Sequence, residues 1–217
     1  MHYQFLIEDY SGSALIEEIM KRLVTDVYLN TYSCKSFRGI GGFKPKNTVK
    51  EIRTGKLLND LAIYMRGFQR ALQDIDAVLI IVLDNDKNDP VEFQNKLEAV
   101  AVKNGIVMDH VFCIAVEEME AWLLGDEEAI KSAYPNMKAG VLHSYVQDSI
   151  CGTWEVLAET VYKGGMKSIR NKRMSYKEIG TLKSEWARNI GKCMDFNHNK
   201  SPSFMHFLNS ITSRLAV

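Results

Sequence analysis

The sequence predicts an α/β fold with a parallel four-stranded sheet flanked by helices and a helical C-terminal extension. Within the first 125 residues, short apolar segments alternate with segments whose apolar residues recur at helical spacing. Such alternation is typical of parallel strands joined by crossover helices. After residue 126 no segment has the pattern of a buried strand. We therefore expect an α/β core over 1–125 and a helical cap or lobe over 126–217.

Four strands and four helices alternate in this prediction. Residues 77–83, AVLIIVL, are entirely apolar and rich in β-branched side chains, which is typical of a strand buried on both faces. Leucine, isoleucine and methionine at helical spacing predict a helix over 13–24. The other predicted strands are 3–8, 26–32 and 110–116. The other predicted helices are 47–73, as one helix or two, then 91–103 and a helix that begins at 117.

Composition excludes several classes of protein. Lys plus Arg and Asp plus Glu each number 27, so the chain is neither a wholly basic nucleic-acid clamp nor a protein with an acidic tail. The four cysteines form no Cys-x-x-Cys pair, which argues against a zinc knuckle or a redox motif. The N-terminus lacks signal-peptide features, and no apolar run approaches the roughly 18 residues of a membrane span. We expect a cytoplasmic protein with reduced thiols and no membrane segment.

Carboxylates follow three of the predicted strands where each strand ends. They are Glu8, Asp84, Asp86, Glu117, Glu118 and Glu120. Because the C-terminal ends of parallel strands meet at one edge of a sheet, we expect these groups to converge there, where ligands bind in open α/β folds. Clustered carboxylates repel one another unless a cation lies among them. Oxygen ligands without nearby Cys or His favour Mg²⁺ or Mn²⁺, which typically serve phosphate chemistry.

A structural explanation is open for each acid. Asp84 and Asp86 could form only a turn, and Glu8 could sit beside a helix cap. The glutamates after 110–116 could stabilise the N-terminus of the next helix by interacting favourably with its dipole. Glu118 and Glu120 are two residues apart, so on a continuous helix they would not share a face. In that case one would be a ligand and the other a supporting partner.

Two basic clusters flank these acids in the sequence. Residues 35–56 hold seven Lys and Arg against Glu51, and residues 163–192 hold nine against two glutamates. Such flanks suit a polyanion, although each could also be a solvated helix face. Tyr162, Tyr176 and Trp186 lie in the second cluster and could stack on bases. The predicted phosphate contacts are Lys163, Lys167, Arg170, Lys172 and Arg173.

Four segments resemble a Toprim-like bacterial family, one of the numbered domains of unknown function. They are IEDYSGSAL, VLIIVLDNDKND, IAVEEMEAWLLGD and SPSFMHFL. The Toprim domain is a metal-binding α/β module of topoisomerases, primases and nucleases, and the resemblance places its acids on Glu8, Asp84, Asp86, Glu118 and Glu120. It also implies relatives among phage-defence nucleases, which are often encoded beside an ATPase partner. In the first segment Asp9-Tyr10 replaces the usual Gly and its neighbour.

The resulting hypothesis is a Mg²⁺- or Mn²⁺-dependent phosphodiesterase, most simply a nuclease acting on DNA or RNA. Asp84 and Asp86 would hold metal, Glu8 would be a ligand or general base, and Glu118 or Glu120 would complete the site. A second hypothesis is a non-catalytic Toprim-like subunit that binds nucleic acid or an ATPase partner. A third is a response-regulator-like phosphoacceptor domain, which would need a Lys after a late strand. None follows residue 116 in that context.

Overall fold

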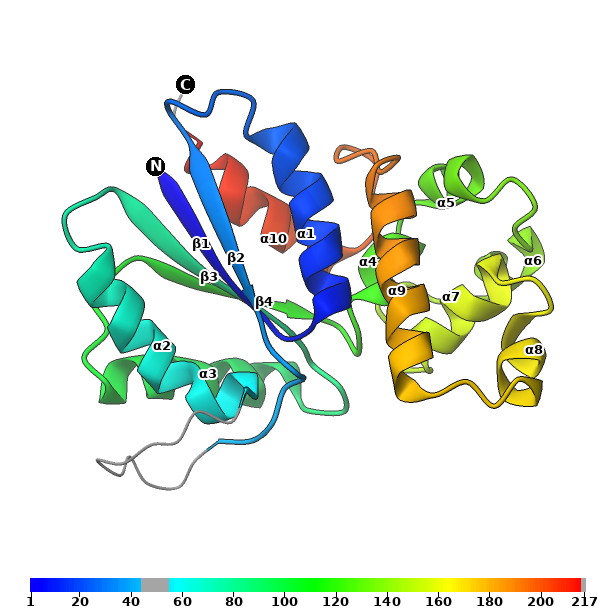
Figure 1. The fold of residues 1–217 in the computed structure, drawn as a ribbon, viewed down its shortest axis with the longest axis horizontal. Helices are drawn as coiled ribbons and strands as arrows, with labels where there is room; N and C mark the ends of the chain where they lie inside the picture. Colours follow the sequence, from blue (N-terminus) through cyan, green and yellow to red (C-terminus); the bar gives the residue numbers. More distant parts are fainter. Residues whose placement is uncertain (44–54, 216–217) are drawn as a thin grey trace.

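Four parallel strands form one sheet in the order β2-β1-β3-β4. The computed structural model of the chain describes residues 1–43 and 55–215. The strands are β1 (His2–Ile7), β2 (Thr31–Ser36), β3 (Ala77–Asp84) and β4 (His110–Ala115). Helices flank the sheet, and a C-terminal helix follows (Figure 1). The predicted α/β fold with an all-parallel four-stranded sheet is confirmed.

Ten helices lie within the described residues. Three connect the strands, namely α1 (Tyr10–Leu23), α2 (Leu57–Ala71) and α3 (Pro90–Lys103). The rest follow β4: α4 (Glu120–Leu124), α5 (Glu127–Ala133), α6 (Ala139–His143), α7 (Thr153–Val161), α8 (Gly165–Asn171), α9 (Tyr176–Gly191) and α10 (Pro202–Thr212). No helix in this part of the chain is both long and apolar enough to cross a membrane.

The two faces of the sheet bury two separate hydrophobic clusters. Side chains alternate along a strand, so Ile80 and Val82 of β3 face one side while Leu79 and Ile81 face the other. The first side packs against α1 and α10, and the second against α2 and α3 (Figure 1). This explains why β3 is apolar throughout, as expected of a central parallel strand.

The helices after β4 join the same core as α1 and the sheet. α9 packs along α1, and α10 packs against β4. Trp122 of α4 is fully buried and packs against both Phe204 and Phe207 of α10, with ring centroids 5.7 and 4.9 Å away. At the start of α1, a side chain in place of Gly12 would meet Met119 Cε at 2.7 Å, so the glycine permits this close packing. The packing therefore places α9 beside the end of β1.

The predicted strand at 26–32 was wrong in its position. Residues 26–30 form a turn in which the Asp26 carboxylate accepts hydrogen bonds from the amides of Tyr28 and Leu29, at 2.8 and 3.3 Å. The Tyr28 side chain is 96% exposed. The strand begins at Thr31 and is the polar segment TYSCKS at the edge of the sheet. An edge strand needs less apolar burial, so hydrophobicity pointed to the wrong residues.

Helix boundaries also differ from the predicted ones. α1 begins at Tyr10 because Asp9 caps it, accepting a hydrogen bond from Gly12 N at 2.7 Å. α2 begins at Leu57, and the predicted helical residues 47–54 lie outside the described residues. The last predicted helix begins at Glu120 rather than 117.

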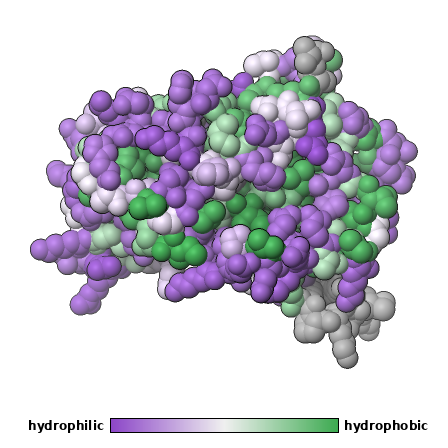
Figure 2. All heavy atoms as spheres, turned by 180° about the vertical axis from the view of Figure 1, so that it is seen from behind, coloured by the Kyte–Doolittle hydropathy of each residue, from purple (hydrophilic) through white to green (hydrophobic). Residues whose placement is uncertain are grey.

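Hydrophilic residues cover most of the back of the molecule, with smaller hydrophobic patches between them (Figure 2).

Candidate carboxylate and lysine site

Glu8 and Asp84 lie together at the point where the direction of the sheet connections changes. In the order β2-β1-β3-β4, the chain leaving β1 connects to β2 on one side, and the chain leaving β3 connects to β4 on the other side. The two connections therefore run in opposite directions from the C-terminal ends of β1 and β3. Glu8 follows β1, and its amide donates to Val82 O of β3 at 3.0 Å. Its carboxylate accepts a hydrogen bond from the Asp84 amide at 2.9 Å. This topological switch point is where open α/β sheets bind ligands.

Lys183 of α9 supplies a positive charge to the acids. Its ammonium Nζ lies 3.2 Å from Glu120 Oε2 and 3.8 Å from Glu118 Oε1. The Lys183 side chain is 15% exposed and that of Glu120 is 4% exposed. Burial alone would lower the pKa of Lys183, but Glu120, Glu118 and Asp84 raise it overall. The lysine is therefore charged and is the cation at the centre of the cluster.

Both Glu118 and Glu120 reach the same ammonium, contrary to the expectation from a continuous helix. The backbone turns before α4 begins: Glu117 has a φ of 60°, and the Glu118 amide donates to Val116 O at 2.9 Å. Glu118 thus precedes the helix while Glu120 starts it. The helical spacing rule does not apply across this bend, so the two side chains converge.

The carboxylates outnumber the lysine, and their protonation equilibria are displaced. Burial, then nearby acids, raises the pKa of Glu8 to about 7 despite the hydrogen bond from Asp84. Burial raises the pKa of Glu118 to about 7, against the pull of Lys183. Burial and Glu8 raise the pKa of Asp84 well above its usual value, and burial also raises that of Glu120. Such displaced groups are typical of functional sites.

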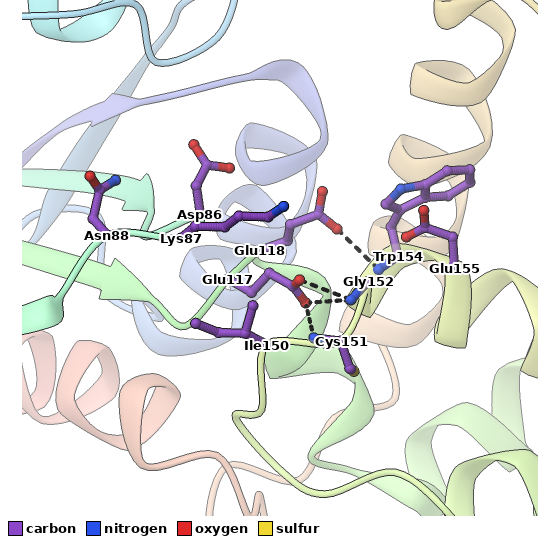
Figure 3. A pocket seen from close by; sticks show the side chains of 10 residues that line it. All are labelled: Asp86, Lys87, Asn88, Glu117, Glu118, Ile150, Cys151, Gly152, Trp154 and Glu155. Atoms are coloured by element: carbon purple, nitrogen blue, oxygen red, sulfur yellow. Dashed lines mark hydrogen bonds between the residues drawn. The ribbon is translucent and has the colours of Figure 1, made fainter.

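A pocket of about 770 Å³ opens beside this cluster (Figure 3). Asp86 and Lys87 line it from the loop after β3, and Trp154 lines it from α7, with Glu118 between them. Asp86 is largely exposed, and its partial burial, followed by the charge of Glu117, raises its pKa. Asp86 therefore lies at the open side of the site rather than among the buried acids.

Glu117 anchors the N-terminus of α7. Its carboxylate accepts hydrogen bonds from the amides of Cys151 and Gly152 at 2.8–3.1 Å (Figure 3). It also accepts one from the Thr153 amide at 2.9 Å and one from the Thr153 hydroxyl. Burial would raise the pKa of Glu117, but these hydrogen bonds lower it overall. Glu118 accepts the next amide, that of Trp154, at 3.0 Å. The two glutamates thus hold α7 against the edge of the sheet.

The donor set suits a hard divalent cation in its chemistry. Glu8, Asp84, Glu118 and Glu120 offer carboxyl oxygens and outnumber the one lysine among them. Within residues 1–43 and 55–215, however, no three acidic, histidine or cysteine side chains are grouped so that they could hold one metal ion. The described arrangement is a lysine-neutralised cluster, in which Glu118 and Glu120 face Lys183.

The predicted phosphate contacts lie on and around α8, away from the residues that line the pocket. Lys163, Lys167, Arg170, Lys172 and Arg173 are all exposed. Lys172 donates to the Tyr162 hydroxyl at 2.9 Å. None of the five lines the pocket beside Glu118. Four bases of the first cluster lie outside the described residues: Lys44, Lys46, Lys50 and Arg53.

Sequence reasoning missed the role of Lys183. It counted this residue among nine bases of a solvated or phosphate-binding face. The signal was present in its setting, because Leu182 is half-buried and Ser184 and Trp186 are buried around it. A lysine on the apolar side of a helix needs a buried partner.

Comparison of the chain with family models, curated proteins and solved structures gave no match. Its function is therefore inferred from the residues of the site itself.

Proposed function

We propose that this edge of the sheet hydrolyses phosphodiester bonds of DNA or RNA with the help of Mg²⁺ or Mn²⁺. The observation that supports this most is the meeting of Glu8 and Asp84 at the topological switch point of an all-parallel sheet, with Glu118 and Glu120 beside them. Clustered carboxyl groups of this kind favour a divalent cation, because the cation lets them ionise together. The resemblance to Toprim-like proteins, drawn from the same acids, points to the same chemistry.

The residues present divide into holding and proton-transfer roles. Glu8 and Asp84 would hold the ion, with Asp86 at the open side of the site. A bound Mg²⁺ would supply charge neutralisation at phosphate and an acidified water. Alternatively, a Glu8 that does not bind the ion has a pKa raised by burial to about 7, so it can take up a proton near neutral pH, as a general base must. Lys183 would hold Glu118 and Glu120 in place and remain protonated.

A second candidate is a binding subunit without catalysis. It is favoured by one observation: Lys183 already neutralises Glu118 and Glu120, and no ready trio of ligands is present in the described residues. In that case the acids would serve the packing of α4, α7 and α9 against the sheet. The two candidates differ in whether the purified protein cleaves a substrate.

The deciding experiment is a cleavage assay with supercoiled plasmid and with end-labelled RNA, in millimolar Mg²⁺ or Mn²⁺ and in EDTA. We expect metal-dependent cleavage that Glu8→Gln and Asp84→Asn each reduce by at least about a hundredfold. Asp89→Asn is the matched control, because Asp89 caps α3 and asparagine caps equally well. Absence of metal-dependent cleavage with both substrates would favour the binding subunit.

A further inference from the structure

A second depression, the α1–α9 groove, shares no lining residue with the pocket beside Glu118. It has a volume of about 570 Å³. Residues at the start of α1, residues after β2 and residues of α9 line it. Asp9 and Ser184 line it, and they directly follow Glu8 and Lys183 in the chain. Asp9 is close enough to Glu8, Asp84 and Lys183 to affect their pKa values, so the groove lies beside the acid cluster.

Three positive side chains line the groove from two elements. They are Arg38 after β2, and Lys177 and Arg188 on α9. All three are exposed, and within the described residues none of the three side chains forms an ion pair or hydrogen bond. Asp9 is the one acid in the lining, and its carboxylate is engaged by Gly12 N at 2.7 Å and Ser11 Oγ at 2.6 Å. The groove thus presents three positive side chains that no acidic side chain of the described residues neutralises by an ion pair.

Two tyrosines lie in the same lining. Tyr10 at the start of α1 is 65% exposed, and Tyr176 at the start of α9 is 96% exposed. Neither position gains from burial in the core, so packing does not account for aromatic residues there. Exposed aromatic rings beside unpaired cations are the combination that holds unpaired bases and their phosphates. In a duplex the base faces are already stacked on one another and would leave these rings unused.

We propose that the α1–α9 groove binds a single strand of nucleic acid, with phosphates at Arg38, Lys177 and Arg188 and bases against Tyr10 and Tyr176. The role of the groove rests on the proposed function, since a strand bound there would be delivered to the carboxylates. Binding of the strand to the groove needs neither metal nor cleavage. It also assigns binding to the groove rather than to the bases around α8.

The test measures binding of a dye-labelled oligothymidylate of about 20 nucleotides by fluorescence anisotropy in EDTA, over a range of salt concentrations. The triple variant Arg38→Gln/Lys177→Gln/Arg188→Gln should bind at least about tenfold more weakly. Its slope of log affinity against log salt should be shallower by roughly 2, about 0.7 for each phosphate contact. The rival variant Lys167→Gln/Arg170→Gln/Arg173→Gln removes the same charge from α8 and should lose far less affinity.

Two further measurements make the proposal specific. Tyr176→Ala changes a side chain that is 96% exposed, so the fold should be unaffected, and it should weaken binding at least about fivefold. A duplex of equal length should bind more weakly than the single strand. The proposal is overturned if the groove triple variant, folded as judged by melting, binds like the wild type. It is equally overturned if the α8 variant suffers the larger loss, or if the duplex binds as tightly.

Failure here and failure of the proposed function are distinguishable. If the protein binds the single strand but does not cleave it in Mg²⁺ or Mn²⁺, the proposed hydrolysis is contradicted and the groove is still the binding site. If the folded groove triple variant binds and cleaves like the wild type in the presence of metal, the groove is not the binding site, and the proposed hydrolysis is retained.

Discussion

Replacing Lys183 with methionine tests whether this lysine is the cation on which the acid cluster depends. Methionine keeps the length of the side chain but removes the charge. Glu118 and Glu120 would then lose the ammonium that lies 3.8 and 3.2 Å from them. The two glutamates are 22% and 4% exposed, so water can replace the lysine only in part. We expect a large loss of stability.

The size of the loss follows from the burial of the ion pair. Removing one partner of a buried pair typically costs 3–5 kcal/mol in free energy of unfolding. Because Lys183 itself is 15% exposed, we take the lower end, about 3 kcal/mol. In a protein of this length that corresponds to a fall in Tm of roughly 6–12 °C. The fall should be larger at pH 8 than at pH 6, since protonation of the stranded carboxyl groups limits their repulsion.

The assay is thermal unfolding in EDTA followed by circular dichroism. Lys192→Met is the matched control, because Lys192 is exposed at the end of the same helix and its loss should change stability by less than about 0.5 kcal/mol. Adding Glu120→Gln to Lys183→Met should restore part of the loss, since it removes a stranded charge. If Lys183→Met melts within about 2 °C of the wild type at pH 8, Lys183 does not stabilise this cluster.

Three other predictions concern the same region. Asp84→Asn/Asp86→Asn should melt at or above the wild type in EDTA but lose the Mg²⁺-dependent gain, roughly 2.7 kcal/mol at a hundredfold excess over Kd; marked destabilisation in EDTA would show that these aspartates are structural turn residues. Burial raises the pKa of Glu8 to about 7, so the folded state binds this proton more tightly than the unfolded chain does. The contribution of Glu8 to stability in EDTA should therefore be lost as pH rises from about 5 through 7, and pH-dependent melts should show this fall for the wild type but not for Glu8→Gln. Glu117→Gln should cost about 1–2 kcal/mol and speed hydrogen exchange at the amides of 151–153; unchanged exchange would contradict the anchoring of α7.

The sheet and the position of the acids followed from the sequence because both depend on local patterns. The segment 77–83 is apolar on both faces, so it had to be a central strand, and crossover helices of sufficient length forced the sheet to be parallel. Once the strands are parallel, acids at their C-terminal ends must share an edge. Accordingly, the Glu8 carboxylate accepts a hydrogen bond from the Asp84 backbone amide, and burial, followed by the charge of Glu8, raises the pKa of Asp84.

The edge strand was misplaced because β2 gives a weak hydrophobic signal. Its residues TYSCKS are mostly half-buried, whereas the more apolar 27–29 lie in an exposed turn. Hydrophobicity identifies strands that are buried, and an edge strand is defined instead by its hydrogen bonds to β1. Those bonds are not encoded in the segment alone.

The sequence by itself determined which groups gather at the edge of the sheet, whereas only the tertiary structure decided what neutralises them. A long helical segment separates Lys183 from the last strand in the sequence. Lys183 reaches Glu120 because α9 packs along α1. Likewise, a backbone bend at Glu117, not helical spacing, lets Glu118 and Glu120 share one ammonium. Strand periodicity is local and readable, but a charge brought in by distant packing depends on contacts that no local pattern contains.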